Sequence, residues 1–309
     1  MKRFERYLNL VREACEGMPD RRTGKNLMYR IGDIGMAAFA CFFMQSPSFL
    51  AFQRMLEDLC GDSNARTLFG MERIPCDNHI RQTLDGVPPE HFDDVFIAMV
   101  RDLDRKGALR RMRRLRDRTL IALDGTQTFS STTIKCDNCS TRTRHKGTDR
   151  ETVEYFHSFL GATLVAPGQA TALPLPPEFI RPRDGAGKQD CECNAVKRWL
   201  ARIGPRVRSL NPLFLGDALL ACQPVCEAIH EIGGNFILTA KPGSHKALYE
   251  ELSRCRPETL TRTVTRGVRK RRTVRHRYAW QADLRIRDGA AAMPACGPEP
   301  PGIRDARSL

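Results

Sequence analysis

Two short apolar runs, each leading into an aspartate, limit most strongly how this chain can fold. Residues 119–126 carry Leu-Ile-Ala-Leu before Asp124, and residues 213–216 lead directly into Asp217. Apolar runs of this length are typical of buried strands. Residues 190–203, which lie between the two runs, have the apolar spacing of a helix. Strands that alternate with helices indicate an α/β fold.

The neighbouring segments extend this pattern. We expect further strands at residues 158–166, 169–175 and 235–240, with a hairpin across the Pro-Gly dipeptide between the first two. A helix is expected at residues 224–232, where two glycines end the apolar spacing. Residues 119–260 are therefore expected to form a mixed sheet with helices.

The paired aspartates indicate metal-dependent chemistry. Strands that end at the same edge of an open α/β sheet bring their terminal side chains together at the place where such sheets bind ligands. Carboxylate oxygens select hard cations such as Mg²⁺ or Mn²⁺. Two such ions can activate an attacking oxygen and stabilise the leaving oxygen of a phosphodiester. Asp124 and Asp217 are thus candidate catalytic and metal-binding residues, although a single aspartate in this position is also common as a turn or cap residue.

The charge of the chain favours a polyanionic partner. The sequence holds 50 lysines and arginines against 36 aspartates and glutamates, a net charge of +14. Because cations that neutralise phosphates release counterions, we expect nucleic acid as the partner, although ribosomal and membrane-surface proteins are basic too. Two basic clusters are candidate DNA contacts, with a solvated charged surface as the alternative: Arg110, Arg111, Arg113 and Arg114, and Arg269, Lys270, Arg271 and Arg272.

The N-terminal part of the chain predicts helices and no strand. Apolar residues recur at helical spacing in residues 1–20, 30–44, 49–60, 77–86 and 88–103. We interpret residues 1–118 as a helical DNA-binding region. The short helix capped by Asp77 or Asn78 is the candidate recognition helix of a helix-turn-helix.

The 12 cysteines point to metal binding rather than to disulfides. The N-terminus lacks the apolar segment of a secretory signal, and the longest apolar stretch, residues 34–44, is too short to span a membrane. We therefore expect a cytoplasmic protein with reduced thiols. The candidate structural Zn²⁺ ligands are Cys136, Cys139, Cys191 and Cys193. His145 or His157 could replace one of these thiolates as a ligand, and loop cysteines that bind no metal are the other interpretation.

Several short motifs occur in order along the chain: Leu-Asp-Gly-Thr at 123–126, Leu-Gly-Asp-Ala at 215–218, Asn-Phe-Ile-Leu at 235–238, Lys-Pro at 241–242, and the segments 45–53 and 177–192. Taken together, these motifs resemble insertion-sequence transposases of the DDE type, whose catalytic domain is RNase H-like. The similarity covers about residues 30–288. It implies Asp124 and Asp217 as catalytic residues, Mg²⁺ or Mn²⁺ as cofactor, and double-stranded DNA, both element ends and target, as partner. It further implies a bacterial, nucleoid-associated protein and allows a homodimer.

The resemblance also implies a third catalytic acid, a glutamate on a helix that follows a β-rich insertion. Residues 261–288 alternate in polarity and match such a basic insertion. Residues 289–309 are rich in Gly, Ala and Pro, and we expect a disordered tail in which Glu299, between prolines, cannot lie on a helix. We therefore expect the RNase H-like core at residues 119–260 to be incomplete through truncation or frameshift, with a natural flexible tail as the alternative.

Three functional hypotheses follow. The first is a transposase that catalyses metal-dependent strand cleavage and transfer, with activity impaired by the missing acid. The second is a catalytically inactive truncated transposase that acts only as a DNA-binding protein. The third, an unrelated zinc-binding RNA protein, requires the cysteines to matter and the two aspartates not to.

Overall fold

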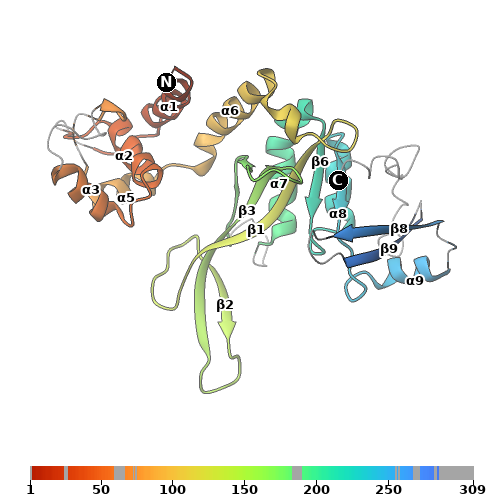
Figure 1. Cartoon of the computed structure of the whole chain (residues 1–309). Helices are drawn as coiled ribbons and strands as arrows, with labels where there is room; N and C mark the ends of the chain where they lie inside the picture. The colour runs from red at the N-terminus through yellow and green to blue at the C-terminus, as the bar shows by residue number, and fades with distance from the viewer. Residues whose placement is uncertain are drawn as a thin grey trace. The chain divides into compact units, whose positions relative to one another are not determined.

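The computed structural model describes residues 2–23, 27–58, 67–71, 73, 75–182, 190–254, 256, 258–266, 272–281 and 284. Over these residues the protein has a mixed α/β structure, as predicted (Figure 1). The chain divides into two compact units, Met1–Lys106 and a second unit that begins at Gly107. Residues 107–118, which the sequence analysis placed with the N-terminal helices, therefore belong to the second unit.

The first unit is helical, and each predicted segment contains a helix. Helix α5 begins at Asp77, but its N-cap is Cys76 and no side chain caps it, so the predicted cap is wrong. Helix α2 is buried along most of its length, and Ile34 and Ala40 are completely inaccessible to solvent. The helices are α1 (Lys2–Glu16), α2 (Ile31–Phe43), α3 (Phe49–Asp58), α5 (Asp77–Leu84), the 3-10 helix η1 (Pro89–Phe92) and α6 (Asp93–Arg105).

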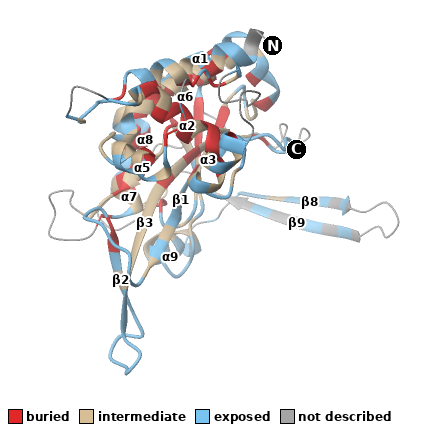
Figure 2. Cartoon of the chain, turned by 90° about the vertical axis from the view of Figure 1, so that its left-hand side faces the viewer, coloured by how far each residue is buried: buried red, intermediate tan, exposed pale blue. Residues whose placement is uncertain are grey.

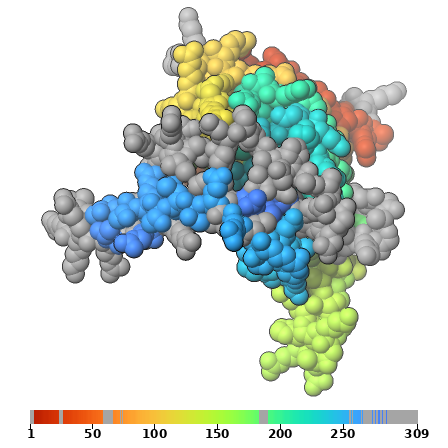
Figure 3. Space-filling view, turned by 90° about the vertical axis from the view of Figure 1, so that its right-hand side faces the viewer, coloured from red at the N-terminus to blue at the C-terminus, as the bar shows by residue number. Residues whose placement is uncertain are grey.

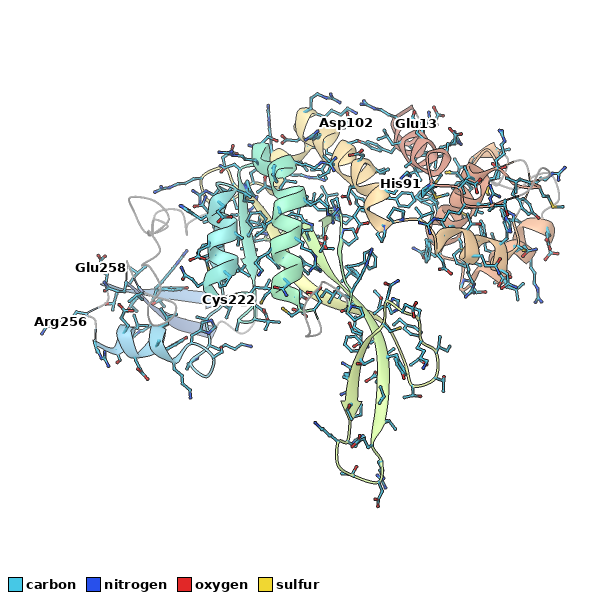
Figure 4. All side chains as sticks on the ribbon, turned by 180° about the vertical axis from the view of Figure 1, so that it is seen from behind. Glu13, His91, Asp102, Cys222, Arg256 and Glu258 are labelled. Carbon is cyan, nitrogen blue, oxygen red and sulfur yellow. The ribbon has the colours of Figure 1, made fainter. Side chains whose placement is uncertain are left out.

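A buried carboxylate on α6 ties that helix to α1. Asp102 is only 2 % exposed, and Figure 4 labels it on α6. The hydroxyl of Tyr7 donates a hydrogen bond of 2.8 Å to Asp102, and Arg6 Nη1 lies 3.0 Å from the same carboxylate. Lys106 and Arg105 add hydrogen bonds from the end of α6. Bonds from Lys106, Tyr7 and Arg105 hold the pKa of this carboxyl far below its ordinary value.

The second unit is built on a mixed sheet with the strand order β2-β3-β1-β6-β7. Strand β1 pairs antiparallel with β3 on one side and parallel with β6 on the other, and β6 pairs parallel with β7. The short strands β4 and β5 pair with β3. The strands are β1 (Thr119–Ser131), β2 (Ser140–Arg144), β3 (Thr152–Val165), β4 (Leu173–Pro174), β5 (Glu178–Ile180), β6 (Pro212–Gly216) and β7 (Asn235–Leu238).

Helices provide the crossovers between the parallel strands, as the sequence predicts. Helix α7 (Glu192–Val207) precedes β6, and α8 (Gln223–Glu231) connects β6 to β7. The indole of Trp199 is fully buried, meets Phe214 of β6 edge to face at 6.1 Å, and donates a hydrogen bond of 2.7 Å to the Pro176 carbonyl. Helix α7 is thereby fixed against both the sheet and the segment that leads into β5.

Strands β1 and β3 are longer than predicted and continue into an arm with β2. Their pairing runs from Leu120 with Val165 to Ser131 with Tyr155, with an irregularity between Gln127 and Phe129. Figure 1 shows this arm extending from the rest of the sheet, and Figure 2 shows how exposed β2 and its turn are. The predicted strand at residues 169–175 is reduced to β4, although the hairpin after β3 is present.

The basic segment near the end of the chain forms a hairpin. Strand β8 (Glu258–Arg266) pairs antiparallel with β9 (Arg272–Trp280), and α9 (Lys246–Arg254) precedes them. Figure 3 shows these elements in blue. Residues 289–309, predicted to be a disordered tail, lie outside the described residues. None of the described helices has the length and apolarity needed to cross a membrane.

Candidate metal-binding sites

The two predicted aspartates lie on neighbouring strands of the sheet. The last parallel pair between β1 and β6 is Ala122 with Leu215, so Asp124 and Asp217 each lie two residues beyond this pair. Because side chains alternate along a strand, this offset places both carboxylates on the same face if the extended chain continues. Both residues are exposed. The prediction that Asp124 ends its strand is wrong, because β1 continues to Ser131 along β3.

A third carboxylate, which the sequence analysis did not identify as functional, joins the two aspartates. Glu192 is the first residue of α7. Its side chain lies directly over Gly125, where a Cβ atom would stand only 2.1 Å from Glu192 Oε1. Partial burial and the negative charges of Asp124 and Asp217 raise the pKa of Glu192. Carboxyl groups from β1, the end of β6 and the start of α7 therefore converge at one edge of the sheet.

A network of ion pairs holds the start of α7 in place. Arg198 donates hydrogen bonds of 2.8 Å to both Asp190 and Glu178, and Arg202 donates another of 2.8 Å to Glu178. The side chain of Asp190 is 0 % exposed and that of Glu178 is 9 % exposed. The network thus links the residue two positions before Glu192 to strand β5, and it limits the positions that the Glu192 carboxylate can adopt.

The loop after β6 is also constrained by hydrogen bonds. Leu219 N donates a bond of 2.9 Å to Asp217 Oδ1. Farther along, the buried His245 contacts the Ala221 carbonyl through Nε2 at 2.6 Å, while the Lys241 amide donates to its Nδ1 at 3.2 Å. Because a carbonyl oxygen can only accept, Nε2 is the donor in the contact with Ala221. His245 therefore ties the segment before α9 to the loop that begins at Asp217.

The three carboxylates gather negative charge at this edge of the sheet. The carboxylate oxygens of these three residues do not all lie within 4.8 Å of one another. Such separation is expected of like charges, which repel one another at short range. A hard cation between them would neutralise this repulsion and accept carboxylate oxygens as ligands. Asp124, Asp217 and Glu192 are the residues that would hold it.

A second candidate metal site lies on the arm. Cys136 Sγ and Cys139 Sγ are 3.7 Å apart, and His157 Nε2 lies 3.1 Å from each sulfur. Within the described part of the chain, this is the one group of at least three Cys, His, Asp or Glu residues whose ligand atoms all lie within 4.8 Å. His157, named from sequence as an alternative ligand, is therefore the histidine that joins the CxxC motif.

Cys191 and Cys193 do not join this group. Cys191 is the N-cap of α7, and Cys193 Sγ donates a hydrogen bond to the Leu219 carbonyl at 3.3 Å. The thiol of Cys222 lies 4.0 Å from Cys193 Sγ, and Figure 4 labels Cys222 beside the start of α8. The predicted four-cysteine zinc site is thus not formed, because α7 starts at the carboxylate edge whereas Cys136 and Cys139 lie on the arm.

The predicted DNA-binding residues of the first basic cluster differ in their surroundings. Arg110 and Arg111 are exposed in the 3-10 helix η2 (Ala108–Met112). Arg113 is half-buried and pairs with Asp117 at 2.7 Å. Arg114, also half-buried, donates to the carbonyls of Arg111, Arg113 and Pro167. Two of these arginines are therefore available to an external phosphate and two support the local turn.

The second basic cluster can be placed only in part. Arg269, Lys270 and Arg271 lie outside the described residues, and Arg272 is the first residue of β9. Among the described side chains of the hairpin, Arg275 is exposed and Arg262 is half-buried. The hairpin therefore carries exposed positive charge within its described strands.

Neither a protein-family model nor a curated protein matches this chain in sequence.

Proposed function

We propose that the second unit is an RNase H-like domain of the DDE transposase type. The family resemblance expects the first catalytic acid on the first strand and the second after the fourth strand. Asp124 lies on β1, and Asp217 follows β6. When β2 of the arm is left out and β4 and β5 are counted as one edge beside β3, β6 is the fourth strand. The central position of β1, between an antiparallel and a parallel neighbour, supports this assignment.

We further propose that the domain cleaves and transfers DNA strands with divalent metal ions. The observation that carries this proposal is the convergence of Glu192 with the two aspartates. Metal ions at such a site lower the pKa of a bound water or 3′-hydroxyl and stabilise charge on the leaving oxygen. Asp124 and Asp217 would hold the metal, and Glu192 would supply a further oxygen ligand or position an attacking water.

Positive charge outside the carboxylate site supports DNA as the substrate. Arg110 and Arg111 are exposed shortly before β1, and exposed Arg275 lies on the basic hairpin. The whole chain carries a net charge of +14. Contacts of these cations with phosphates would bind DNA without regard to sequence and would weaken as salt rises.

Nicking of supercoiled plasmid DNA tests the proposal without knowledge of the natural target sequence. Wild-type protein should convert supercoiled to open-circular DNA in Mn²⁺, and chelation should stop the reaction. Asp124→Asn and Asp217→Asn should abolish nicking and preserve DNA binding. Asp149→Asn, at an exposed turn of the arm, is the matched control. If wild-type protein binds DNA but does not nick it under any divalent cation, the DNA-binding alternative replaces the proposal.

A further inference from the structure

The loop that carries Cys136 and Cys139 must cross from one side of β3 to the other. It leaves β1 after Ser131 and enters β2 at Ser140, and β1 and β2 flank β3 on opposite sides. Strand β3 pairs with both partners in the same stretch, since Phe156 faces Ser130 of β1 and Ser140 of β2. The adjacent residue on β3 is His157, whose ring meets the two cysteines at this crossing.

Few apolar contacts hold the crossing loop in place. Residues 132–138 are all exposed, and the side chain of Ile134 is 66 % exposed. Ser131 Oγ accepts hydrogen bonds from the amides of Thr133 and Ile134, which order only the start of the loop. At the other end Cys139 is 7 % exposed. A loop without a core of its own gains most from a cross-link to the strand beneath it.

The distances in the cluster agree with tetrahedral zinc. Zn–S bonds of about 2.3 Å and Zn–N bonds of about 2.0 Å place two sulfurs about 3.8 Å apart, and a sulfur and a nitrogen about 3.5 Å apart. The observed S–S separation of 3.7 Å matches, and the S–N separations of 3.1 Å need to open only slightly. A disulfide would require the sulfurs to approach to about 2.0 Å.

The backbone of the CxxC segment forms a tight turn. Cys136 N donates to Cys139 Sγ at 3.3 Å, and Cys139 N donates to the Cys136 carbonyl at 3.1 Å. The tight turn therefore presents both sulfurs toward His157.

We propose that Cys136, Cys139 and His157 bind a zinc ion that fastens the crossing loop to strand β3. Two thiols release their protons to solvent on binding, and the two thiolates balance the charge of Zn²⁺. Soft thiolate and imidazole ligands select zinc over Mg²⁺ or Mn²⁺. The fourth position is open to solvent on the side of Cys136, which is exposed. This site is separate from the carboxylate site and does not depend on its function.

Metal analysis of the full chain tests the ligand set. After dialysis against a weak chelator, wild-type protein should retain about one zinc per chain. Cys136→Ser and His157→Ala should lose it. The double variant Cys191→Ser/Cys193→Ser and the variant His145→Ala should keep it, because none of these residues belongs to the cluster. Zinc well below one equivalent in wild-type protein, or its loss in the double variant, overturns the proposed ligand set.

Two measurements on wild-type protein keep the proposal testable where a ligand variant does not fold. Titration of the apoprotein with Co²⁺ should give the intense visible bands of tetrahedral cobalt and a near-ultraviolet thiolate charge-transfer band. Weak octahedral bands would exclude the cluster. Zinc should also slow amide hydrogen exchange in residues 132–139 and 152–157 but not in β7. Zinc binding without this protection would contradict the role as a fastener.

Discussion

The contact between Gly125 and Glu192 allows the carboxylate site to be tested by adding a single methyl group. In Gly125→Ala the new Cβ would stand 2.1 Å from Glu192 Oε1, whereas ordinary contacts begin at 3.4 Å. The carboxylate must therefore withdraw by 3.4 minus 2.1, or about 1.3 Å. A misplacement of about 1 Å at a reacting centre can cost about 10²-fold in rate. We expect Mn²⁺-dependent plasmid nicking to fall by about that factor.

The stability of this variant should change little, which separates the effect from misfolding. The atoms that must move are Glu192 Oε1, Cδ and Cγ, which lie 2.1, 2.2 and 2.8 Å from the added Cβ and all belong to one flexible side chain. Alanine in a strand is favoured over glycine by roughly 0.5–1 kcal/mol. Gly161→Ala is the matched control, since Gly161 on β3 pairs with Asp124 on β1 and its added Cβ would meet its nearest atoms at 3.6 Å. Thermal unfolding checks both folds. If Gly125→Ala keeps its fold and nicks DNA at the wild-type rate, the position of Glu192 does not matter for function.

Three further substitutions test the packing and electrostatics. The pKa of Glu192 is raised above its unfolded value. Ionisation of this carboxyl therefore lowers the free energy of unfolding, an effect that is absent below about pH 4 and grows as pH rises through the folded pKa. Glu192→Gln should therefore stabilise the metal-free protein at pH 7 in urea unfolding, whereas Glu231→Gln, exposed on α8, should not; equal effects would contradict this. Trp199→Ala removes a fully buried ring and should lower the unfolding free energy of the second unit by about 3–5 kcal/mol, and a loss below about 1 kcal/mol would show that the ring is not packed as described. Tyr7→Phe removes the hydroxyl that is bonded to Asp102 and should destabilise the N-terminal helices by about 1 kcal/mol. Amide hydrogen exchange in α1 and α6 measures this loss, and an unchanged exchange rate would contradict it.

The sequence predicts the helices and the buried strands well because their apolar residues mark them. It does not predict the arm, since residues 127–157 are largely exposed. Their strand structure depends on pairing between residues far apart in the chain, such as Arg142 with Glu154. Those two residues also form an ion pair at 2.6 Å. The extension of β1 beyond Asp124 follows from the same pairing.

The candidate sites show a similar division. Asp124 and Asp217 can be found because each follows an apolar run. Glu192 cannot, because an acid at the first position of a helix is locally explained by the helix dipole, and only the sheet brings it to Gly125. Likewise, spacing alone cannot decide whether Cys136 and Cys139 combine with His157 or with Cys191 and Cys193. The crossing of the loop over β3 decides it.

The most direct measurement of the central claim is anomalous diffraction from crystals soaked in Mn²⁺. We expect a manganese peak at the sheet edge, coordinated by both Asp124 and Asp217, with Glu192 as a direct or water-mediated neighbour. The peak should vanish in crystals of Asp124→Asn. Saturating Mn²⁺ with no peak between the two aspartates, or manganese bound only elsewhere on the chain, would contradict the proposal that this edge is a metal-dependent catalytic site.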